Sequence, residues 1–501
     1  MAHNSPFYSF FLEDEAASLR FGEDFSPVLR PNDCVLLDGT LGMGKTTIAR
    51  AIIRSFLGDD EAEVPSPTFT LANVYDKGRT SLTHYDLYRL SEPEELEEIG
   101  FAESLDAAIV LVEWPERAMQ DMPSDALRIE ITEKDGGRLL EFFGPERWEK
   151  RLHRTLSIRA FLNDNNWNDA RRRFLQGDAS PRAYELVTHK NGTEAVLMDS
   201  PAIEDGPIVK DGKRYSELAH LAEDVRPFLA IGEALRAADL PAPEMYAYDL
   251  KQGFLLMQDF GQETVIANGQ PHPERYQVAI DILAKMHGQD WPASVALPDG
   301  SEYHLPAFDQ SVFDIEISLL ADWYAPKVAE ITFSEKAWDE YLAIWQDLFE
   351  LVSTGEKSWF LRDYHSPNLM WREDQTGLEK IGLIDYQDAL IGPSAYDVAS
   401  LCQDARYSVP QDMEQMLKVR YIDARHIQDK PFDVEAFERD YAIIAAERGT
   451  RLLGLWPRLK YRDGKPHYMN HMPRTKDYLR RALKHPVLVD LKRWYADNLG
   501  L

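Results

Sequence analysis

Eight residues between an apolar run and a helical stretch have the types and spacing of a phosphate-binding loop. The segment Gly39-Thr40-Leu41-Gly42-Met43-Gly44-Lys45-Thr46 fits the pattern G-x-x-x-x-G-K-[ST] and follows the apolar run Cys34–Leu37. The three glycines allow backbone N–H groups to turn toward a phosphate, and a helix that opens near Lys45 presents its positive end there. We expect Lys45 to reach the β- and γ-phosphate oxygens and the Thr46 hydroxyl to bind Mg²⁺.

A phosphate-binding loop also needs a carboxylate for its metal ion, usually at the end of a neighbouring strand. Glu113 directly follows the apolar run Ile109–Val112, and Asp86 is a second candidate. Taken alone, either acid is more typical of a solvated loop end. Next to the phosphate-binding loop, the position of Glu113 favours a role at the metal.

A second set of acidic and amide side chains lies in the C-terminal half. Asp363 is followed five positions later by Asn368, and Asp385 comes 17 residues after Asn368, behind an apolar run. Transfer of a phosphoryl group to a hydroxyl needs an acid that accepts the substrate proton and ligands for the metal ions of ATP. The order of these residues therefore predicts Asp363 as the catalytic base, with Asn368 and Asp385 as Mg²⁺ ligands.

Two polar residues close to this second set in the sequence have roles that the motif alone does not decide. His365 is expected to shape the loop rather than act as a base, because a carboxylate already fills that role. Asp388 is either a third metal or substrate ligand, or the N-cap of a helix beginning at Ala389.

The apolar run Ala195–Asp199 offers no lysine where the V-A-I-K pattern of kinases has one. Lys190, Lys210 and Lys213 lie nearby and are candidates for the missing phosphate clamp, although lysines at such positions are more often on the surface. The clamp therefore stays unassigned.

The first set of residues needs a strand, a tight turn and a helix. Cys34–Leu37 has the length of a buried strand, residues 46–56 have helical spacing that Gly58 ends, and Ala108–Val112 is a second buried strand. Further strands are expected over Ala126–Thr132 and Arg138–Phe143, on either side of a glycine turn. Strands alternating with a helix indicate an α/β domain of the P-loop NTPase class.

The second set needs a β-rich lobe followed by helices. Short strand-like runs occur over Ala183–Thr188, Glu194–Met198 and Gly253–Met257, with one helical segment expected over Glu217–Arg236. Amphipathic stretches then follow, such as residues 276–287 and 338–351. This order predicts a two-lobed, protein-kinase-like α+β domain.

A change in amino-acid composition marks the expected boundary between the two halves. Residues 146–173 are charged and rich in asparagine. We therefore expect a P-loop ATPase domain over residues 1–145, a linker over 146–164, a kinase-like N-lobe over 165–260 and a helical C-lobe over 261–501.

Four motifs in the first half resemble, in order, the TsaE (YjeE) family, the small ATPase of the bacterial machinery that makes threonylcarbamoyladenosine in tRNA. They are Gly39–Thr47, Pro65–Leu71, His84–Arg89 and Val112–Glu116. The resemblance implies ATP hydrolysis with Mg²⁺ in a complex with TsaB- and TsaD-like subunits. It places Asp86 and Glu113 at the metal and the attacking water, and Ser66-Pro67-Thr68 in a loop that senses the γ-phosphate. The nucleotide contacts that it implies are Gly39, Thr40, Gly42, Gly44, Lys45, Thr46, Thr47 and Trp114.

The second half resembles the aminoglycoside phosphotransferase-like kinases, and within them the amino-sugar kinases of cell-wall recycling. The motifs that carry this resemblance are Gly177–Ser180, Val196–Asp199, Gly253–Asp259, Leu361–Asn368, Ile384–Asp388 and Gly392–Asp397. It implies phosphorylation of N-acetylmuramate or N-acetylglucosamine at the anomeric hydroxyl by MgATP. It also implies that the glycine-poor loop Gly177–Ser180 covers the nucleotide.

Composition limits the partners and the compartment. The 501 residues carry 55 basic and 85 acidic side chains, a net charge of −30, which argues against a direct grip on nucleic acid phosphates and leaves tRNA to partner subunits. Only two cysteines occur, which excludes a disulfide framework. With no long apolar run and no signal-like N-terminus, we expect a cytoplasmic protein without membrane contact.

The sequence thus predicts a fusion of two ATP-dependent enzymes, with alternatives in each half. The kinase acceptor is alternatively an aminoglycoside, a choline-like amine or a homoserine-like metabolite. The C-terminal half is alternatively a non-catalytic module that binds nucleotide or tethers partners, which the missing lysine favours. The N-terminal half is alternatively an assembly switch with slow turnover.

Overall fold

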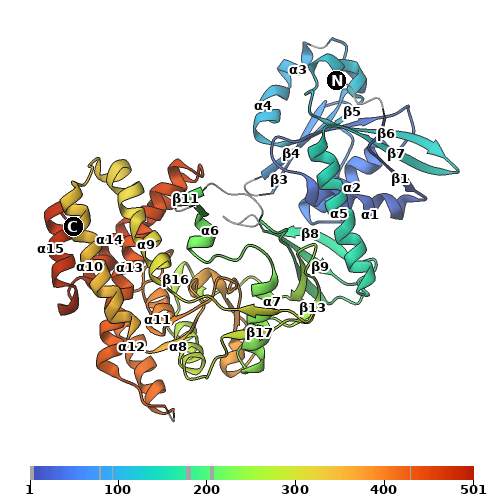
Figure 1. Cartoon of the computed structure of the whole chain (residues 1–501). Helices are drawn as coiled ribbons and strands as arrows, with labels where there is room; N and C mark the ends of the chain where they lie inside the picture. Colours follow the sequence, from blue (N-terminus) through green and yellow to red (C-terminus); the bar gives the residue numbers. More distant parts are fainter. Residues whose placement is uncertain are drawn as a thin grey trace. The chain divides into compact units, whose positions relative to one another are not determined.

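The structure is a computed structural model that describes residues 5–501, except 78, 79, 93, 176–181, 204–207, 211 and 429. The chain forms two compact units (Figure 1). The first consists of Met1–Ser200 with Tyr246–Asp259, and the second of Pro201–Met245 with Phe260–Leu501.

A seven-stranded mixed sheet forms the centre of the first unit, in the order β1-β7-β6-β2-β5-β4-β3. Its strands are β1 (Tyr8–Leu12), β2 (Cys34–Asp38), β3 (Ala72–Lys77), β4 (Thr80–Asp86), β5 (Ile109–Glu113), β6 (Leu127–Lys134) and β7 (Gly137–Phe143). Strand β2 pairs in parallel with β5 and β6, and β4 pairs in parallel with β5. The carboxyl ends of these parallel strands therefore share one edge, where ligands of α/β sheets bind.

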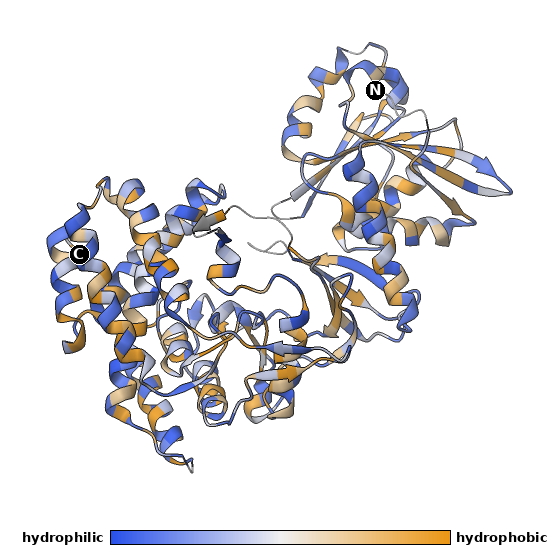
Figure 2. Ribbon diagram, viewed as in Figure 1, coloured by the Kyte–Doolittle hydropathy of each residue, from blue (hydrophilic) through white to orange (hydrophobic). Residues whose placement is uncertain are grey.

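Helices cover both faces of this sheet (Figure 1). They are α1 (Glu15–Phe25), α2 (Lys45–Leu57), α3 (Glu95–Glu98), α4 (Phe101–Ala107) and α5 (Glu146–Asp164), with the 3-10 turns η1 (Ser26–Val28), η2 (Leu87–Arg89) and η3 (Pro115–Asp121). The central strands consist mostly of hydrophobic residues (orange in Figure 2), as expected for strands that are buried on both faces. The expected helix after the glycine turn is confirmed, and Gly58 ends it with a φ of 70°.

A second sheet in the same unit has the order β13-β14-β10-β9-β8. Its strands are β8 (Arg171–Leu175), β9 (Ala183–Thr188), β10 (Glu194–Asp199), β13 (Met245–Asp249) and β14 (Phe254–Gln258). Strand β10 pairs antiparallel with both β9 and β14. The β-rich lobe expected from the sequence is thus present as a five-stranded sheet.

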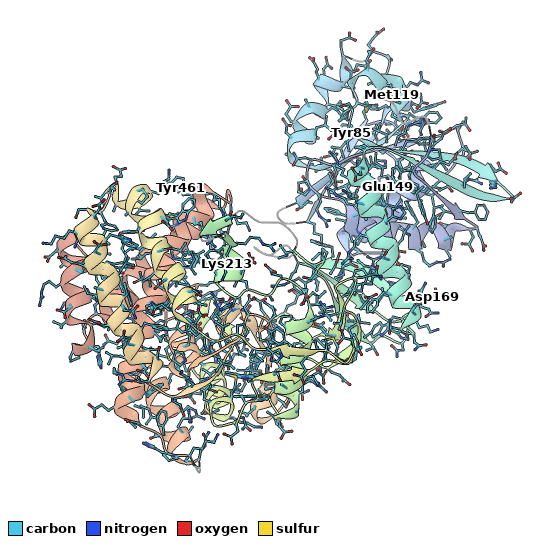
Figure 3. The ribbon with its side chains drawn as sticks, in the orientation of Figure 1. Tyr85, Met119, Glu149, Asp169, Lys213 and Tyr461 are labelled. Atoms are coloured by element: carbon cyan, nitrogen blue, oxygen red, sulfur yellow. The ribbon has the colours of Figure 1, made fainter. Side chains whose placement is uncertain are left out.

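Helix α5 joins the two sheets of the first unit. Figure 3 labels Glu149 on this helix and Asp169 just beyond it. Trp148 and Leu152 are buried in the core of the seven-stranded sheet, whereas Ile158 and Phe161 are buried in the core of the five-stranded sheet. The residues expected to form a linker therefore form a helix that belongs to both cores.

The second unit is mainly helical. Its helices are α6 (Tyr215–Leu218), α7 (Arg226–Ala237), α8 (Pro273–His287), α9 (Gln310–Leu319), the π-helix η4 (Leu320–Ala329), α10 (Glu335–Ser353), α11 (Ala395–Cys402), α12 (Gln411–His426), α13 (Val434–Tyr461), α14 (Met472–Ala482) and α15 (Val489–Leu499), with 3-10 turns η5 (Ser366–Asn368), η6 (Gly377–Lys380), η7 (Pro466–His471) and η8 (Pro486–Leu488). Helix α13 packs against α9, α11 and α14.

Short two-stranded sheets complete this unit. They are β11 (Ile208–Lys210) with β12 (Lys213–Arg214), β15 (Ile266–Ala267) with β16 (Gln270–Pro271), β17 (Ser294–Ala296) with β18 (Glu302–His304), β19 (Lys357–Phe360) with β22 (Leu390–Pro393), and β20 (Leu369–Trp371) with β21 (Ile381–Leu383). The last two of these sheets frame the residues expected to catalyse phosphoryl transfer.

The prediction of one continuous helix over residues 217–236 is wrong, because the structure has α6 and α7 with an irregular segment between them. His220 has a φ of 50°, which a right-handed helix does not allow. A new helix then starts, with the Arg226 N–H bonded to the Asp224 carboxylate at 2.8 Å and Pro227 in its first turn. The helical spacing of apolar residues in the sequence gave no sign that one helix ends and a second one begins here.

Candidate functional sites

The glycine turn after β2 forms a cradle at the carboxyl edge of the first sheet. Gly42 and Gly44 have φ values of 84° and 90°, a left-handed conformation that residues with a Cβ adopt at a cost. Helix α2 begins at Lys45, so its free N–H groups open toward the cradle. The turn lines a hollow of about 500 Å³ together with Trp114 and residues 130–133 of β6.

Lys45 is held inside this turn. Its ammonium donates to the backbone oxygens of Gly39 at 2.5 Å and Thr40 at 3.1 Å, and lies 3.4 Å from the centre of the Trp114 ring. Burial lowers the pKa of Lys45 from its usual value, and Glu113 is the strongest of the acids that oppose this shift. Two loop oxygens thus accept hydrogen bonds from the lysine that was expected to reach phosphate oxygens.

Glu113 ends β5 and is almost fully buried, with 2% of its surface exposed. One carboxylate oxygen accepts the hydroxyl of Thr46 at 2.8 Å, and the other lies 2.9 Å from Nε2 of His84. The sequence reasoning assigned no role to His84, which comes from β4 next in the sheet. Thr46 and Glu113, expected to share a metal ion, are thus side by side, and the neighbouring Thr47 is half-buried on α2.

Asp86 ends β4 opposite Glu113 in the strand register. Its Oδ2 accepts the hydroxyls of Ser66 at 2.6 Å and Thr68 at 2.7 Å, and its Oδ1 accepts the Tyr88 N–H at 3.1 Å. The segment that resembles a γ-phosphate sensor is therefore tied to a candidate metal ligand. A change at one must disturb the other.

In the second unit, the loop between β19 and β20 and the segment after β21 bring together the three residues expected to transfer a phosphoryl group. The Asn368 side-chain amide donates to the Asp363 backbone oxygen at 2.9 Å and lies 3.4 Å from Asp385 Oδ2. Gln387 donates to the other oxygen of Asp385 at 2.9 Å. Asp363 and Asp385 are both half-buried, so their carboxylates are within reach of a ligand.

Asp397, at the start of α11, holds the backbone that leads into Asp363. Its carboxyl group accepts the N–H groups of Leu361 at 2.5 Å and Arg362 at 3.0 Å. Burial raises the pKa of Asp397 to about 7, although these two bonds oppose the shift. Asp397 occurred only within a resemblance motif, because a residue 34 positions away gives no local sign of this contact.

Arg362 anchors the same loop from a buried position. Its guanidinium forms an ion pair with Glu316 on α9 and donates to the backbone oxygen of Ala219 at 2.7 Å. Arg451 on α13 also pairs with Glu316, at 3.0 Å. The sequence reasoning missed this ionic cluster, whose members are far apart along the chain.

Burial would raise the pKa of Asp363, but nearby basic groups, first His365 and then Arg451 and Arg362, hold it below its usual value. Asp363 is therefore ionised at neutral pH. His365 is buried and its own pKa is lowered by burial, which fits a residue that shapes the loop.

Asp388 is not the N-cap of a helix, because strand β22 follows it. Its Oδ1 accepts the N–H of Ala222 at 2.6 Å. Asp199, at the end of β10 where kinases have the clamp lysine, forms an ion pair with Arg154 of α5. The loop Gly177–Ser180 and the side chain of Lys210 lie outside the described residues, whereas Lys190 follows β9 and Lys213 begins β12 (Figure 3).

Both sets of residues fit Mg²⁺ by their chemistry. This ion binds oxygen ligands and needs only one or two protein ligands when triphosphate oxygens supply others. Thr46 with Glu113, and Asn368 with Asp385, are such sets. Within the described part of the chain, no group of three or more His, Cys, Asp or Glu residues could hold a metal ion by itself.

None of the helices formed by the described residues combines the length and apolarity needed to cross a membrane. Cys34 and Cys402 are both free and buried.

Comparison with known proteins gives two family matches. Residues 12–140 match the model "Threonylcarbamoyl adenosine biosynthesis protein TsaE", and residues 171–437 match the model "Phosphotransferase enzyme family". The two matches follow each other in the order of the two sites. They confirm the expected fold class, a P-loop-type α/β domain followed by a kinase-like domain.

Individual relatives agree with this division. The N-acetylmuramate/N-acetylglucosamine kinase of Caulobacter vibrioides is 33% identical over 348 residues, covering 67% of this chain and 94% of the relative. The kinase of the same name from Pseudomonas aeruginosa is 31% identical over 278 residues, covering 54% and 77%. The tRNA threonylcarbamoyladenosine biosynthesis protein TsaE of Rickettsia typhi is 43% identical over 105 residues, covering 21% and 72%.

Proposed function

Because the chain belongs to the TsaE family through its N-terminal domain and to the phosphotransferase enzyme family through residues 171–437, we propose that it is a bifunctional enzyme with two separate ATP sites. The first hydrolyses ATP in the synthesis of threonylcarbamoyladenosine in tRNA. The second phosphorylates an amino sugar such as N-acetylmuramate or N-acetylglucosamine at its anomeric hydroxyl.

The single observation that carries the kinase proposal is the grouping of Asp363, Asn368 and Asp385 on one loop system. Asp363 accepts the proton of the acceptor hydroxyl while the oxygen attacks the γ-phosphorus of ATP and ADP leaves. Asn368 and Asp385 would hold Mg²⁺, which would neutralise charge on the phosphates. The ionised state of Asp363 supports its role as the base, and so opposes the reading of this half as a non-catalytic module.

In the ATPase site, Lys45 exchanges its two backbone acceptors for phosphate oxygens when ATP binds. The Thr46 hydroxyl would hold Mg²⁺ beside the phosphates, and Glu113, which accepts that hydroxyl here, would orient the attacking water. Ser66 and Thr68 couple this exchange to Asp86. Partner subunits of the TsaB and TsaD kind bind the tRNA, since the acidic chain itself is unsuited to hold it.

The kinase proposal is tested by incubating the chain with MgATP and a panel of amino sugars, aminoglycosides and amino alcohols, followed by detection of phosphorylated product. Asp363→Ala is expected to lower product formation by about 10² to 10⁴. Asp374→Ala is the matched control, because this exposed carboxylate lies on the loop after β20. Product from an amino alcohol or an aminoglycoside and none from amino sugars would replace the proposed acceptor.

The ATPase proposal is tested by restoring threonylcarbamoyladenosine in tRNA with TsaB- and TsaD-like partner subunits present. Lys45→Ala is expected to abolish both ATP hydrolysis and restoration, whereas Lys150→Ala on the exposed face of α5 should preserve both. Restoration at the native level by the Lys45→Ala protein would reject the assignment. Restoration that needs ATP binding without turnover would instead support the assembly switch.

A further inference from the structure

Arg448 on α13 is a buried cation that forms no ion pair with a carboxylate of the described residues. Only 4% of its surface is exposed, and its Nη1 has no hydrogen-bond partner among the described residues. The guanidinium carbon lies 5.3 Å from the centre of the Tyr396 ring. A buried charge normally has an ion partner, because removing it from water is costly.

The contacts of its neighbours place Arg448 beside the catalytic loop. Tyr396 directly precedes Asp397, whose carboxyl group holds the backbone in front of Asp363. Arg451, one helical turn further along α13, pairs with Glu316, which also pairs with Arg362. Arg448 therefore lies between the two groups that position Asp363.

The acids near Arg448 are bound by other groups: Glu316 pairs with two other arginines, and Asp397 accepts two backbone N–H groups. Arg451 and Arg362 outweigh the effect of burial on Glu316 and hold its pKa below the usual value, so this one ionised carboxylate serves two arginines. Glu447 is buried next to Glu316, and burial followed by this neighbour raises the pKa of Glu447 well above its usual value. Burial favours the neutral form of Glu447, so among the described residues no carboxylate forms an ion pair with Arg448.

We propose that Arg448 binds a carboxylate on the acceptor and so favours an acidic amino sugar over its neutral counterpart, an inference that rests on the proposed kinase function. Asp363 must touch the acceptor hydroxyl, so a cation near Asp363 meets the acceptor, whereas the triphosphate is held at Asn368 and Asp385. A guanidinium also matches a carboxylate with two parallel N–H donors. In a chain with a net charge of −30, such a local cation is needed to attract an anion.

The test compares N-acetylmuramate, which carries a carboxylate, with N-acetylglucosamine, which does not. Arg448→Met is expected to lower kcat/KM for N-acetylmuramate about 10- to 100-fold, mainly through KM, and to change that for N-acetylglucosamine less than about 3-fold. Arg448→Lys should keep part of the preference for N-acetylmuramate, because lysine keeps the positive charge but lacks the two parallel N–H donors of a guanidinium. Arg458→Met is the matched control, since Arg458 stacks on Tyr215 about 15 Å further along the same helix.

Stability gives an independent readout. If Arg448 lacks an ion partner in the free protein, Arg448→Met should leave the unfolding temperature unchanged or raise it, because an unpaired buried charge is removed. A clear drop in the unfolding temperature would assign Arg448 to the structural cluster and overturn the inference.

Each remaining outcome also decides the question. Equal losses with both sugars, a rise in the KM of ATP as the main effect, or no loss at all would overturn the role of Arg448 while the kinase function stands. The same holds if the unaltered protein phosphorylates N-acetylglucosamine but not N-acetylmuramate. An unaltered protein that phosphorylates neither sugar would reject both this inference and the proposed acceptor class.

Discussion

The two candidate ATP sites are held in opposite ways. In the first unit, the residues expected to meet the nucleotide bond one another: Lys45 with its own loop, and Thr46 with Glu113. In the second unit, the site is held by residues that are not expected to contact the nucleotide: Asp397 and Arg362 fix the backbone around Asp363. A site of the first kind must exchange contacts when ATP binds, which suits a switch. A site of the second kind is ready for its substrate, which suits a kinase.

The shared helix α5 predicts the largest effect on stability. Phe161→Ala removes a buried ring from the core of the five-stranded sheet and should cost about 3–5 kcal/mol. Because the same helix contributes Trp148 to the other core, the ATPase domain is expected to unfold at a lower temperature as well. Calorimetry with ATPase activity as the second signal checks this, and an ATPase domain that keeps its native unfolding temperature would show that the two cores are independent.

Loss of the support behind Asp363 should damage catalysis without touching a substrate. Asp397→Ala frees the backbone of Leu361 and Arg362, and a displacement of about 1 Å at Asp363 is expected to lower kcat about 10²-fold. The KM of ATP should change much less, since Asn368 and Asp385 stay in place. Steady-state kinetics on the amino sugar gives both values. A rise in KM with native kcat would contradict a preformed site.

Removing a supporting side chain in the first site should have a smaller effect on the reaction rate. His84 orients Glu113 from a buried position, so His84→Ala is expected to lower the rate of ATP hydrolysis about 10-fold and to leave ATP binding within about 3-fold. The measurements are ADP release and nucleotide binding by the same preparation. If binding is lost together with hydrolysis, His84 supports the fold of the loop rather than the position of Glu113.

The stability of the first unit should depend modestly on pH through one buried carboxyl group. Burial raises the pKa of Glu23 on α1 from 4.5 to about 7. Between these values the unfolded chain releases the proton and the folded chain keeps it, so this group makes stability fall as pH rises from about 4.5 to 7. Glu23→Gln should remove about 1 kcal/mol of this fall, allowing for the partial exposure of the group. Thermal unfolding at pH 5 and pH 7.5 measures it, and an unchanged pH dependence would show that Glu23 is ionised when folded.

The sequence predicted the parts of each site that are contiguous. The phosphate-binding loop lies within eight residues, and its glycines, lysine and threonine have a spacing that dictates their geometry. Asp363 and Asn368 were found for the same reason. Strands β2 and β5 were recognised because runs buried on both faces are apolar throughout.

Contacts between distant residues were beyond reach of the sequence. Glu316 and Arg451 meet Arg362 only because α9 and α13 pack beside the catalytic loop. Helix α5 covers the residues for which the sequence predicts a linker, and its charged surface hides two short apolar faces, one for each core. The break between α6 and α7 was missed because an isolated positive φ at a histidine leaves no mark in the hydrophobic spacing.

The central claim is that one chain carries two chemically independent ATP sites. The most direct measurement is ADP release without sugar and sugar phosphate formation with sugar, both made on the Lys45→Ala and Asp363→Ala proteins. Lys45→Ala is expected to lose the first and keep the second, and Asp363→Ala to do the reverse. If either substitution alone abolishes both activities in a folded protein, the two sites are not independent and the account is wrong.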